Sequence, residues 1–248
     1  MKYFNIVYKV NSIQNIINTN SKLIEKVYIF KKNSKTLNLI DICKKKKIKT
    51  YYIKKINQNE LNYIKHSYNA IAKIKKIKHP NLNDILNIKN KNLKILILDR
   101  VQDPHNLASC IRTSEAFSIN LIILSKKNTA KISSLVHSLS NGASLLLPII
   151  EENKIKNSII KLKNNNIKII GLSAKGENEI KEQIVSSSIA ILMGSEKNGI
   201  QKELKKECDE ILKIKMNSNN KSINLSVATG IILSKIKDEK HYKTIINC

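Results

Sequence analysis

The sequence contains no tryptophan and only three phenylalanines, six glycines and three prolines. A buried core in this chain must therefore be built from isoleucine, leucine and valine. Acidic residues are also scarce, because 19 Asp and Glu stand against 45 Lys and Arg, for a formal net charge of +26. This imbalance excludes an acidic binding protein and favours a polyanionic partner, either nucleic acid or an anionic membrane surface. An apolar content of 42% argues against a disordered chain.

The four cysteines and the five histidines are widely separated in the sequence. Cys43, Cys110, Cys208 and Cys248 form no CxxC pair, so we expect reduced thiols and neither a disulfide framework nor a metal site. No apolar run approaches the ~20 residues that a membrane span needs. Residues 1–12 lack the uninterrupted apolar stretch of a secretion signal, so we expect a cytoplasmic protein.

Arginine is almost absent, since only Arg100 and Arg112 occur among the 45 basic residues. The dominance of Lys, Ile and Asn indicates an AT-rich genome, in which a lysine run such as 44–47 is a solvated helix face. An arginine that survives such mutation pressure points to a need for its planar, permanently charged guanidinium. Retention of two arginines by chance is the alternative.

Residues 77–92 divide the chain and are expected to form a linker, because they hold Pro80 and are rich in Asn and Lys. Residues 1–88 carry 19 lysines and 4 acidic residues, which gives +15, whereas residues 89–248 have a net charge of +11. The smaller part has the higher charge density, as expected for a module that docks on RNA or DNA. We therefore predict a binding domain at 1–76 and a second domain at 93–248.

The two parts differ in their apolar pattern. Residues 1–76 predict a small α/β domain, with strands at 27–30, 50–53 and 70–74 and helices at 13–18 and 37–46. Beyond the linker, continuous apolar runs alternate with helices, which is typical of a parallel sheet covered on both faces. There we expect strands at 93–98, 120–124, 145–150, 168–172, 189–193 and 211–214, and helices at 107–117 and 225–237.

Three polar loops follow predicted strands, at the strand ends where ligands bind in such sheets. In the first loop, residues 99–106, Asn106 is expected to cap the next helix and leave its N-terminal amides free for an anion. The second loop, 193–200, has two glycines that allow close approach of a ligand, but it is neither a dinucleotide fingerprint nor a P-loop. In the third, 214–230, Asn224 and Ser226 begin a helix of small residues. Taken singly, each loop also fits an ordinary helix cap or turn, with Glu196 at a helix start.

Together, the loops resemble the SpoU (TrmH-like) family of RNA ribose 2′-O-methyltransferases, within the SPOUT superfamily. The resemblance covers roughly residues 93–240 and is carried by VQDPHNLASCIRTSEAF at 101–117, SNGASLLLPI at 140–149, ILMGSEKNGI at 191–200 and IKMNSNNKSINLSVATGI at 214–231. The first part resembles, more loosely, the small ribosomal-protein-like (L30e-like) substrate-binding domain of the large-subunit ribosomal RNA enzymes. HSYNAIA at 66–72 looks like its closing segment, although Asn69 replaces the family's glycine.

The resemblance implies an α/β fold, in which a parallel-sheet domain with a trefoil knot follows a small α/β L30e-like domain. It also implies S-adenosylmethionine as cofactor, a homodimer whose active site takes residues from both chains, and no metal. The helix at 226–234 is a plausible interface element. By residue, the resemblance assigns cofactor binding to Gly194, Ile214, Met216, Ile223 and Leu225, and catalysis to Asn106, Arg112, Glu196, Asn224 and Ser226.

The implied reaction is methylation of the ribose 2′-hydroxyl of a guanosine in large-subunit ribosomal RNA. Arg112 is either the base or a phosphate clamp, and we prefer the clamp because an arginine does not lose its proton at neutral pH. Two alternatives remain: a methyltransferase that acts on transfer RNA, and a non-catalytic RNA-binding protein of ribosomal type. A DNA-binding factor fits less well, because no helix-turn-helix or zinc pattern occurs.

Overall fold

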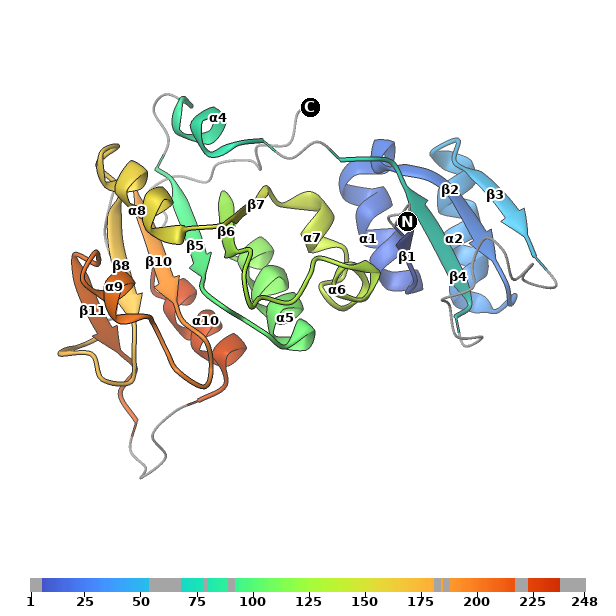
Figure 1. The fold of residues 1–248 in the computed structure, drawn as a ribbon. Helices are drawn as coiled ribbons and strands as arrows, with labels where there is room; N and C mark the ends of the chain where they lie inside the picture. Colours follow the sequence, from blue (N-terminus) through green and yellow to red (C-terminus); the bar gives the residue numbers. More distant parts are fainter. Residues whose placement is uncertain are drawn as a thin grey trace. The chain divides into compact units, whose positions relative to one another are not determined.

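The computed structural model describes residues 6–53, 68–77, 80–88, 92–180, 184, 188–216 and 223–236. The chain divides into two compact units, drawn in Figure 1. Unit 1 comprises Met1–Lys78 and Ile132–Leu146, and unit 2 comprises His79–Lys131 and Leu147–Cys248. The segment 132–146 therefore groups with the amino-terminal residues, a grouping that a single boundary at 77–92 does not anticipate.

Unit 1 contains a mixed sheet whose strand order, among the described residues, is β1-β4-β2-β3. β4 is antiparallel to both β1 and β2, and β3 pairs parallel to β2 at the edge of the sheet. The strands are β1 (Ile6–Val7), β2 (Ile24–Ile29), β3 (Lys49–Tyr52) and β4 (Ala70–Ile74). The helical elements are α1 (Val10–Asn20), η1 (Ser21–Leu23), α2 (Ser34–Lys45), α6 (Ser134–Leu139) and α7 (Ala143–Leu146). Every element predicted for residues 1–76 is found; His66 and Ser67 of the expected closing segment lie outside the described residues.

The segment 132–146 belongs to the core of unit 1. The Tyr8 amide donates to Ser138 Oγ at 3.0 Å, and Ser12 Oγ donates to the Ser138 carbonyl at 3.0 Å. Leu145 lies in the apolar cluster formed by α1, α2 and the sheet. Gly142 has φ +87°, and a Cβ there would meet Ile16 Cγ1 at 2.6 Å, so only glycine fits this turn beside α1.

Unit 2 contains a sheet in which every described pairing is parallel, in the order β7-β6-β5-β10-β8-β11-β9. The strands are β5 (Lys94–Leu98), β6 (Leu121–Ser125), β7 (Ile149–Glu152), β8 (Lys168–Leu172), β9 (Asn178–Glu179), β10 (Ile189–Met193) and β11 (Glu210–Lys213). The helices are α4 (Leu82–Leu86), α5 (Pro104–Ala116), α8 (Ile155–Lys163), α9 (Lys202–Lys205) and α10 (Leu225–Ser234). The central strands β5, β6 and β10 are buried along their whole length, as their mainly apolar sequences predict; the polar residues Lys94 and Ser125 stand at strand ends.

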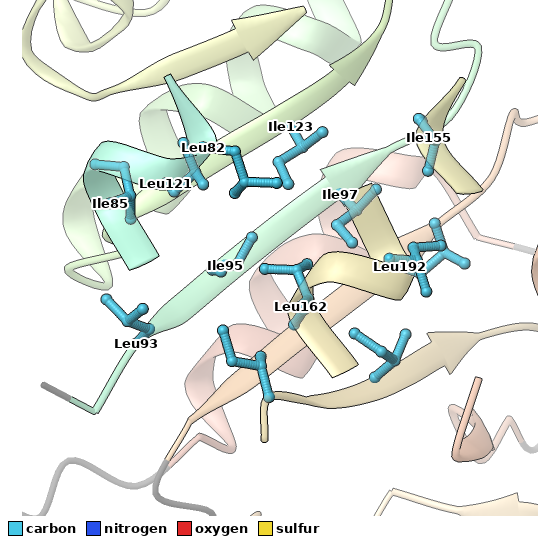
Figure 2. Close-up of a cluster of buried hydrophobic side chains, with 14 of the residues drawn as sticks. Leu82, Ile85, Leu93, Ile95, Ile97, Leu121, Ile123, Ile155, Leu162 and Leu192 are labelled. Carbon is cyan, nitrogen blue, oxygen red and sulfur yellow. The ribbon is translucent and has the colours of Figure 1, made fainter. Parts of the chain in front are cut away.

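The predicted linker contributes to the core of unit 2. Within 77–92, α4 is closed by a capping box between Asn81 and Asp84. Its buried side chains Leu82 and Ile85 join the cluster that includes Leu121 of β6, as Figure 2 shows. Part of this stretch is therefore a packed helix.

The strand predicted at 145–150 is wrong in its first half. Residues 143–146 form α7, and β7 begins only at Ile149. Pro148 explains the break, because proline has no N–H and disfavours helical backbone at the residue before it. None of the helices in the described residues is both long and apolar enough to cross a membrane.

Candidate active site

Helix α5 begins with an Asp-Pro pair three residues before Asn106. Asp103 is the N-cap, and its side chain accepts a hydrogen bond from His105 N at 3.0 Å. Pro104 takes the first helical position, which favours proline because its missing N–H would find no partner there. The expectation that Asn106 caps this helix is therefore wrong, and its side chain is available for other contacts.

Three of the predicted catalytic side chains form one hydrogen-bonded cluster. Asn106 Nδ2 donates a short hydrogen bond to Glu196 Oε1. Asn224 Nδ2 donates to Asn106 Oδ1 at 3.0 Å and to Glu196 Oε1 at 3.4 Å. One carboxylate oxygen thus accepts from two amides that come from the beginnings of two different helices. The fold brings together residues that are 90 and 28 positions apart in the sequence.

Ser226 completes this cluster through Asn224. Asn224 caps α10, and its Oδ1 accepts from Ser226 N at 2.8 Å and from Ser226 Oγ at 2.6 Å. The prediction that Asn224 and Ser226 begin a helix is confirmed. The cap fixes the Asn224 amide, so that its Nδ2 is aimed at Glu196 and Asn106.

Arg112 lies outside this cluster. It is exposed on α5, six residues after Asn106, and six helical residues turn by about 600°, or one full turn plus about 240°, so the two side chains leave the helix in different directions. Among the described residues, the Arg112 guanidinium has no hydrogen bond or ion pair. The fold of a single chain therefore brings together four of the five predicted catalytic residues, and Arg112 lies apart from them.

The loop after β10 is a tight turn that requires glycine at both ends. Gly199 N donates to the Ser195 carbonyl at 2.8 Å, and Gly199 has φ +63°. A Cβ on Gly194 would lie 2.0 Å from the Gly199 carbonyl carbon, which no real structure tolerates. Glu196 lies in this turn, six residues before α9 begins, and not at a helix start.

A buried carboxylate anchors the far end of the same loop. Asp99, at the end of β5, is 1% exposed, and its Oδ2 accepts from Arg100 Nε and from Gln201 Nε2, each at 3.0 Å. Arg100 has φ +57° and also reaches the Gly199 carbonyl at 3.5 Å. A lysine has no second donor in a fixed plane, so the retention of Arg100 in a lysine-rich chain has a structural reason.

A cavity of about 500 Å³ opens between this loop and α10. All five predicted cofactor-binding residues line it: Gly194, Ile214, Met216, Ile223 and Leu225. Glu196 lines it as well, so the polar cluster and the cavity share one side chain. The cavity lies at the carboxyl ends of β8, β10 and β11, where a ligand is expected in a parallel sheet.

Sequence reasoning missed one wall of the cavity. Leu172, the last residue of β8, also lines it, together with Ser173, Ala174 and Lys175, which follow that strand. They carry no recognisable motif, but they follow a buried strand, and the rule that located the other loops could have found them. Lys202 and Lys205 of α9 add positive charge to the lining.

The described cysteines are poor nucleophiles. Burial raises the pKa of the Cys110 thiol to about 11, although a hydrogen bond to Thr229 opposes the rise. Burial likewise raises the pKa of Cys208 to about 11 and that of Cys43 above its usual value. These thiols stay protonated near neutral pH, which disfavours covalent catalysis by cysteine at this site. Within the described residues, no group of three or more His, Cys, Asp or Glu could hold a metal ion.

Comparison with known families and curated proteins points in one direction. The model of the SpoU rRNA methylase family matches residues 93–234. The 23S rRNA (guanosine-2'-O-)-methyltransferase RlmB of Pseudomonas putida is 30% identical over 149 residues, which are 60% of this chain and 60% of that protein. The Escherichia coli protein of the same name is 32% identical over 139 residues, 56% of this chain and 57% of its own length. The matches thus span about 60% of the length of these relatives.

Solved structures match over nearly the whole chain. The SpoU methyltransferase AviRb from Streptomyces viridochromogenes, crystallised with its cofactor AdoMet, has a TM-score of 0.73 at 17% identity and covers 93% of this chain and 88% of its own. An rRNA methyltransferase from Sinorhizobium meliloti has a TM-score of 0.72 at 20% identity, over 94% and 85% of the two chains. At these identities the likeness shows a shared fold, and it confirms the expected α/β fold with a parallel sheet.

Proposed function

Because this chain belongs to the SpoU rRNA methylase family, we propose that it transfers a methyl group from S-adenosylmethionine to a ribose 2′-hydroxyl of RNA. One observation supports this most directly. Glu196 lies both in the polar cluster with Asn106 and Asn224 and in the lining of the cavity. The carboxylate that would orient the ribose hydroxyl thus lies beside the pocket that would hold the methyl donor, as methyl transfer requires.

The cavity suits S-adenosylmethionine in volume and chemistry. Ligand pockets usually measure ~300–1,000 Å³ and are mainly apolar with a few polar groups. Ile214, Met216, Ile223 and Leu225 would flank the adenine, while Gly194 lets the main chain approach closely. Bound there, the cofactor supplies an electrophilic methyl group on a sulfonium centre.

The residues of the polar cluster would position the acceptor. A ribose 2′-hydroxyl is a poor nucleophile until its proton is drawn away, so it needs an acceptor and strict alignment. The Glu196 carboxylate can accept a hydrogen bond from that hydroxyl, and the Asn106 and Asn224 amides keep the carboxylate oriented. Ser226 holds the Asn224 amide in turn.

We assign Arg112 to a homodimeric active site. Its guanidinium is exposed, lies away from the cluster of its own chain and has the bidentate geometry that a phosphate needs. In a dimer it would clamp the target phosphate and ribose beside the cluster of the other chain. The 53% exposed apolar side chain of Val227 on α10 supports an interface along the helix at 226–234.

The proposed substrate is a guanosine of 23S ribosomal RNA, because the matched curated relatives carry that activity in their names. The net charge of +15 on residues 1–88 supports residues 1–76 as an L30e-like domain that binds the RNA. We further propose a trefoil knot near the cavity, where the segments after β10 and β11 meet α10. Ribosomal RNA as substrate implies a cytoplasmic enzyme.

Two measurements test this function. Calorimetry should show heat with S-adenosylmethionine and none with NAD or ATP; a folded protein that gives no heat with S-adenosylmethionine would contradict the proposal and favour a non-catalytic RNA-binding protein. The 2′-O-methyl positions of ribosomal and transfer RNA should then be mapped in cells with and without the protein. A site lost only from transfer RNA would reassign the substrate but keep the reaction.

A further inference from the structure

Unit 1 carries two neighbouring tyrosines on one face of its sheet edge. β2 and β3 are parallel, with Lys26 opposite Lys49 and Tyr28 opposite Tyr51. Residues paired in this way project from the same face of a sheet. The Tyr28 and Tyr51 ring centroids are 5.8 Å apart, with an angle of 35° between their planes. We call Lys26, Tyr28, Lys49 and Tyr51 the tyrosine–lysine patch.

The patch is both accessible and positively charged. Tyr51 is 45% exposed. The chain has only eight tyrosines and no tryptophan, so an aromatic ring left on the surface is one that the core does not use. Lys26 Nζ lies 5.3 Å from the Tyr28 centroid and 5.8 Å from the Tyr51 centroid, so its charge is held beside both rings. Residues 21–53, which include both strands, contain ten lysines and two acidic residues. One of those acids, Glu25, is paired with Lys73 at 3.0 Å.

This combination matches the chemistry of unpaired nucleotides. Every base has a π-face that stacks on an aromatic ring, and its phosphate is attracted to lysine. A duplex hides its base faces, so it would use the lysines but not the tyrosines. Lysine alone is enough to protect a sheet edge from aggregation, and it would not account for exposed rings at this edge.

We propose that the tyrosine–lysine patch binds unpaired bases of the RNA substrate, with Tyr51 as a stacking platform and Lys26 and Lys49 on the adjacent phosphates. This inference rests on RNA as the proposed substrate and adds the surface and the single-stranded form that it recognises.

The test compares Tyr51 with its neighbour Tyr52 in the intact chain. Tyr52 is 56% exposed and has Lys32 Nζ 4.8 Å from its ring, but it projects from the opposite face of the same strand. The probes are a fluorescent oligouridine and an RNA duplex of equal length. The length is about 12 nucleotides, within the range that one single-strand-binding domain covers. Affinities are measured over a range of salt concentrations for wild type, Tyr51→Ala, Tyr51→Phe and Tyr52→Ala, and thermal unfolding checks that each variant is folded.

Tyr51→Ala should weaken oligouridine binding about fivefold or more, because that is the contribution of one stacked base. Tyr51→Phe and Tyr52→Ala should bind like wild type, and duplex affinity should not change. The salt slope should stay the same for Tyr51→Ala. In Lys26→Gln and Lys49→Gln it should become shallower by about 0.7 for each phosphate that the protein no longer neutralises.

Equal losses for Tyr51→Ala and Tyr52→Ala, or no loss for Tyr51→Ala, would overturn the inference. Binding of the same variants to vesicles of phosphatidylglycerol and phosphatidylcholine is measured as well. If Tyr51→Ala loses vesicle binding but keeps its oligouridine affinity, the inference is also overturned, and the patch is assigned to a membrane surface. If wild type binds S-adenosylmethionine but no RNA at all, the proposed function fails as well. Normal wild-type RNA binding with an unaffected Tyr51→Ala refutes only the patch.

Discussion

Replacing Gly194 by alanine tests whether the turn after β10 shapes the proposed cofactor pocket. The added Cβ would lie 2.0 Å from the Gly199 carbonyl carbon, 2.1 Å from its oxygen and 2.2 Å from Ile200 N. Ordinary contact begins at 3.4 Å, so the Gly199 backbone must retreat by about 1.4 Å. All three atoms belong to the main chain, so no side-chain rotation can relieve the contact.

The expected effects follow from that displacement. Overpacking of this kind costs about 1–3 kcal/mol of unfolding free energy. The shift also strains the hydrogen bond from Gly199 N to the Ser195 carbonyl and moves Glu196, which lies between them. Because a misplacement of about 1 Å at a reacting group can cost on the order of 100-fold in rate, we expect methylation to fall by that factor and cofactor affinity to fall with it.

The assay pairs Gly194→Ala with Gly171→Ala in the neighbouring strand β8. A Cβ at Gly171 would meet side-chain atoms alone, Ile211 Cδ1 at 2.7 Å, Cys208 Sγ at 3.0 Å and Ile200 Cδ1 at 3.1 Å, which can shift where main-chain atoms cannot. Calorimetry with S-adenosylmethionine, single-turnover methyl transfer and thermal unfolding are measured for both variants. A folded Gly194→Ala protein that binds the cofactor as well as wild type does would refute the link between this turn and the pocket.

Four further outcomes are expected. Arg112→Lys should abolish methylation without changing cofactor binding, because the charge remains and only the bidentate guanidinium is lost; normal single-turnover rates would remove Arg112 from the active site. Gln201→Glu places a second carboxylate beside the buried Asp99. Two carboxylates this close share one proton, so the activity of the variant relative to wild type should recover as pH falls. If the ratio of the two activities does not depend on pH, Asp99 is excluded as an anchor of the loop. Among the described residues, a Cβ added at Gly230 would meet Thr113 Cγ2 alone, at 3.9 Å, so Gly230→Ala should raise the unfolding free energy by about 1 kcal/mol. It should weaken dimerisation if α10 is an interface, as sedimentation at several concentrations would show. Burial raises the pKa of Cys110 from 9.0 to about 11, so the folded state keeps this thiol protonated where the unfolded state loses the proton. The free energy of unfolding should therefore fall between pH 9 and pH 11, on the order of 2–3 kcal/mol. Cys110→Ala should flatten that part of a pH series of chemical denaturations.

The sequence predicts those elements whose patterns are local. The apolar runs at 168–172 and 189–193 coincide with β8 and β10, because a strand buried on both faces leaves no other pattern. The sequence places Asn106 at the right end of the helix but in the wrong role, since Asp103 is the N-cap and Pro104 takes the first helical position. The hydrogen bonds that join Asn106 to Glu196 and Asn224 depend on the arrangement of three distant segments, which no local pattern encodes. Their grouping follows from resemblance to a family and not from periodicity.

The separation of unit 1 into two stretches of chain has a consequence for the order of synthesis. The Leu145 side chain fills part of the core of unit 1, and Ser138 holds Tyr8 and Ser12. On a ribosome, residues 1–78 therefore emerge without the segment that completes their core, and they must wait until residue 146 has been made. By then the residues of β5 and β6 have been synthesised. The residues of β10, which pairs with the other edge of β5, are synthesised only later, at Ile189–Met193. The two units are thus interleaved in time as well as in sequence, and unit 1 becomes complete while the sheet of unit 2 still lacks a central strand.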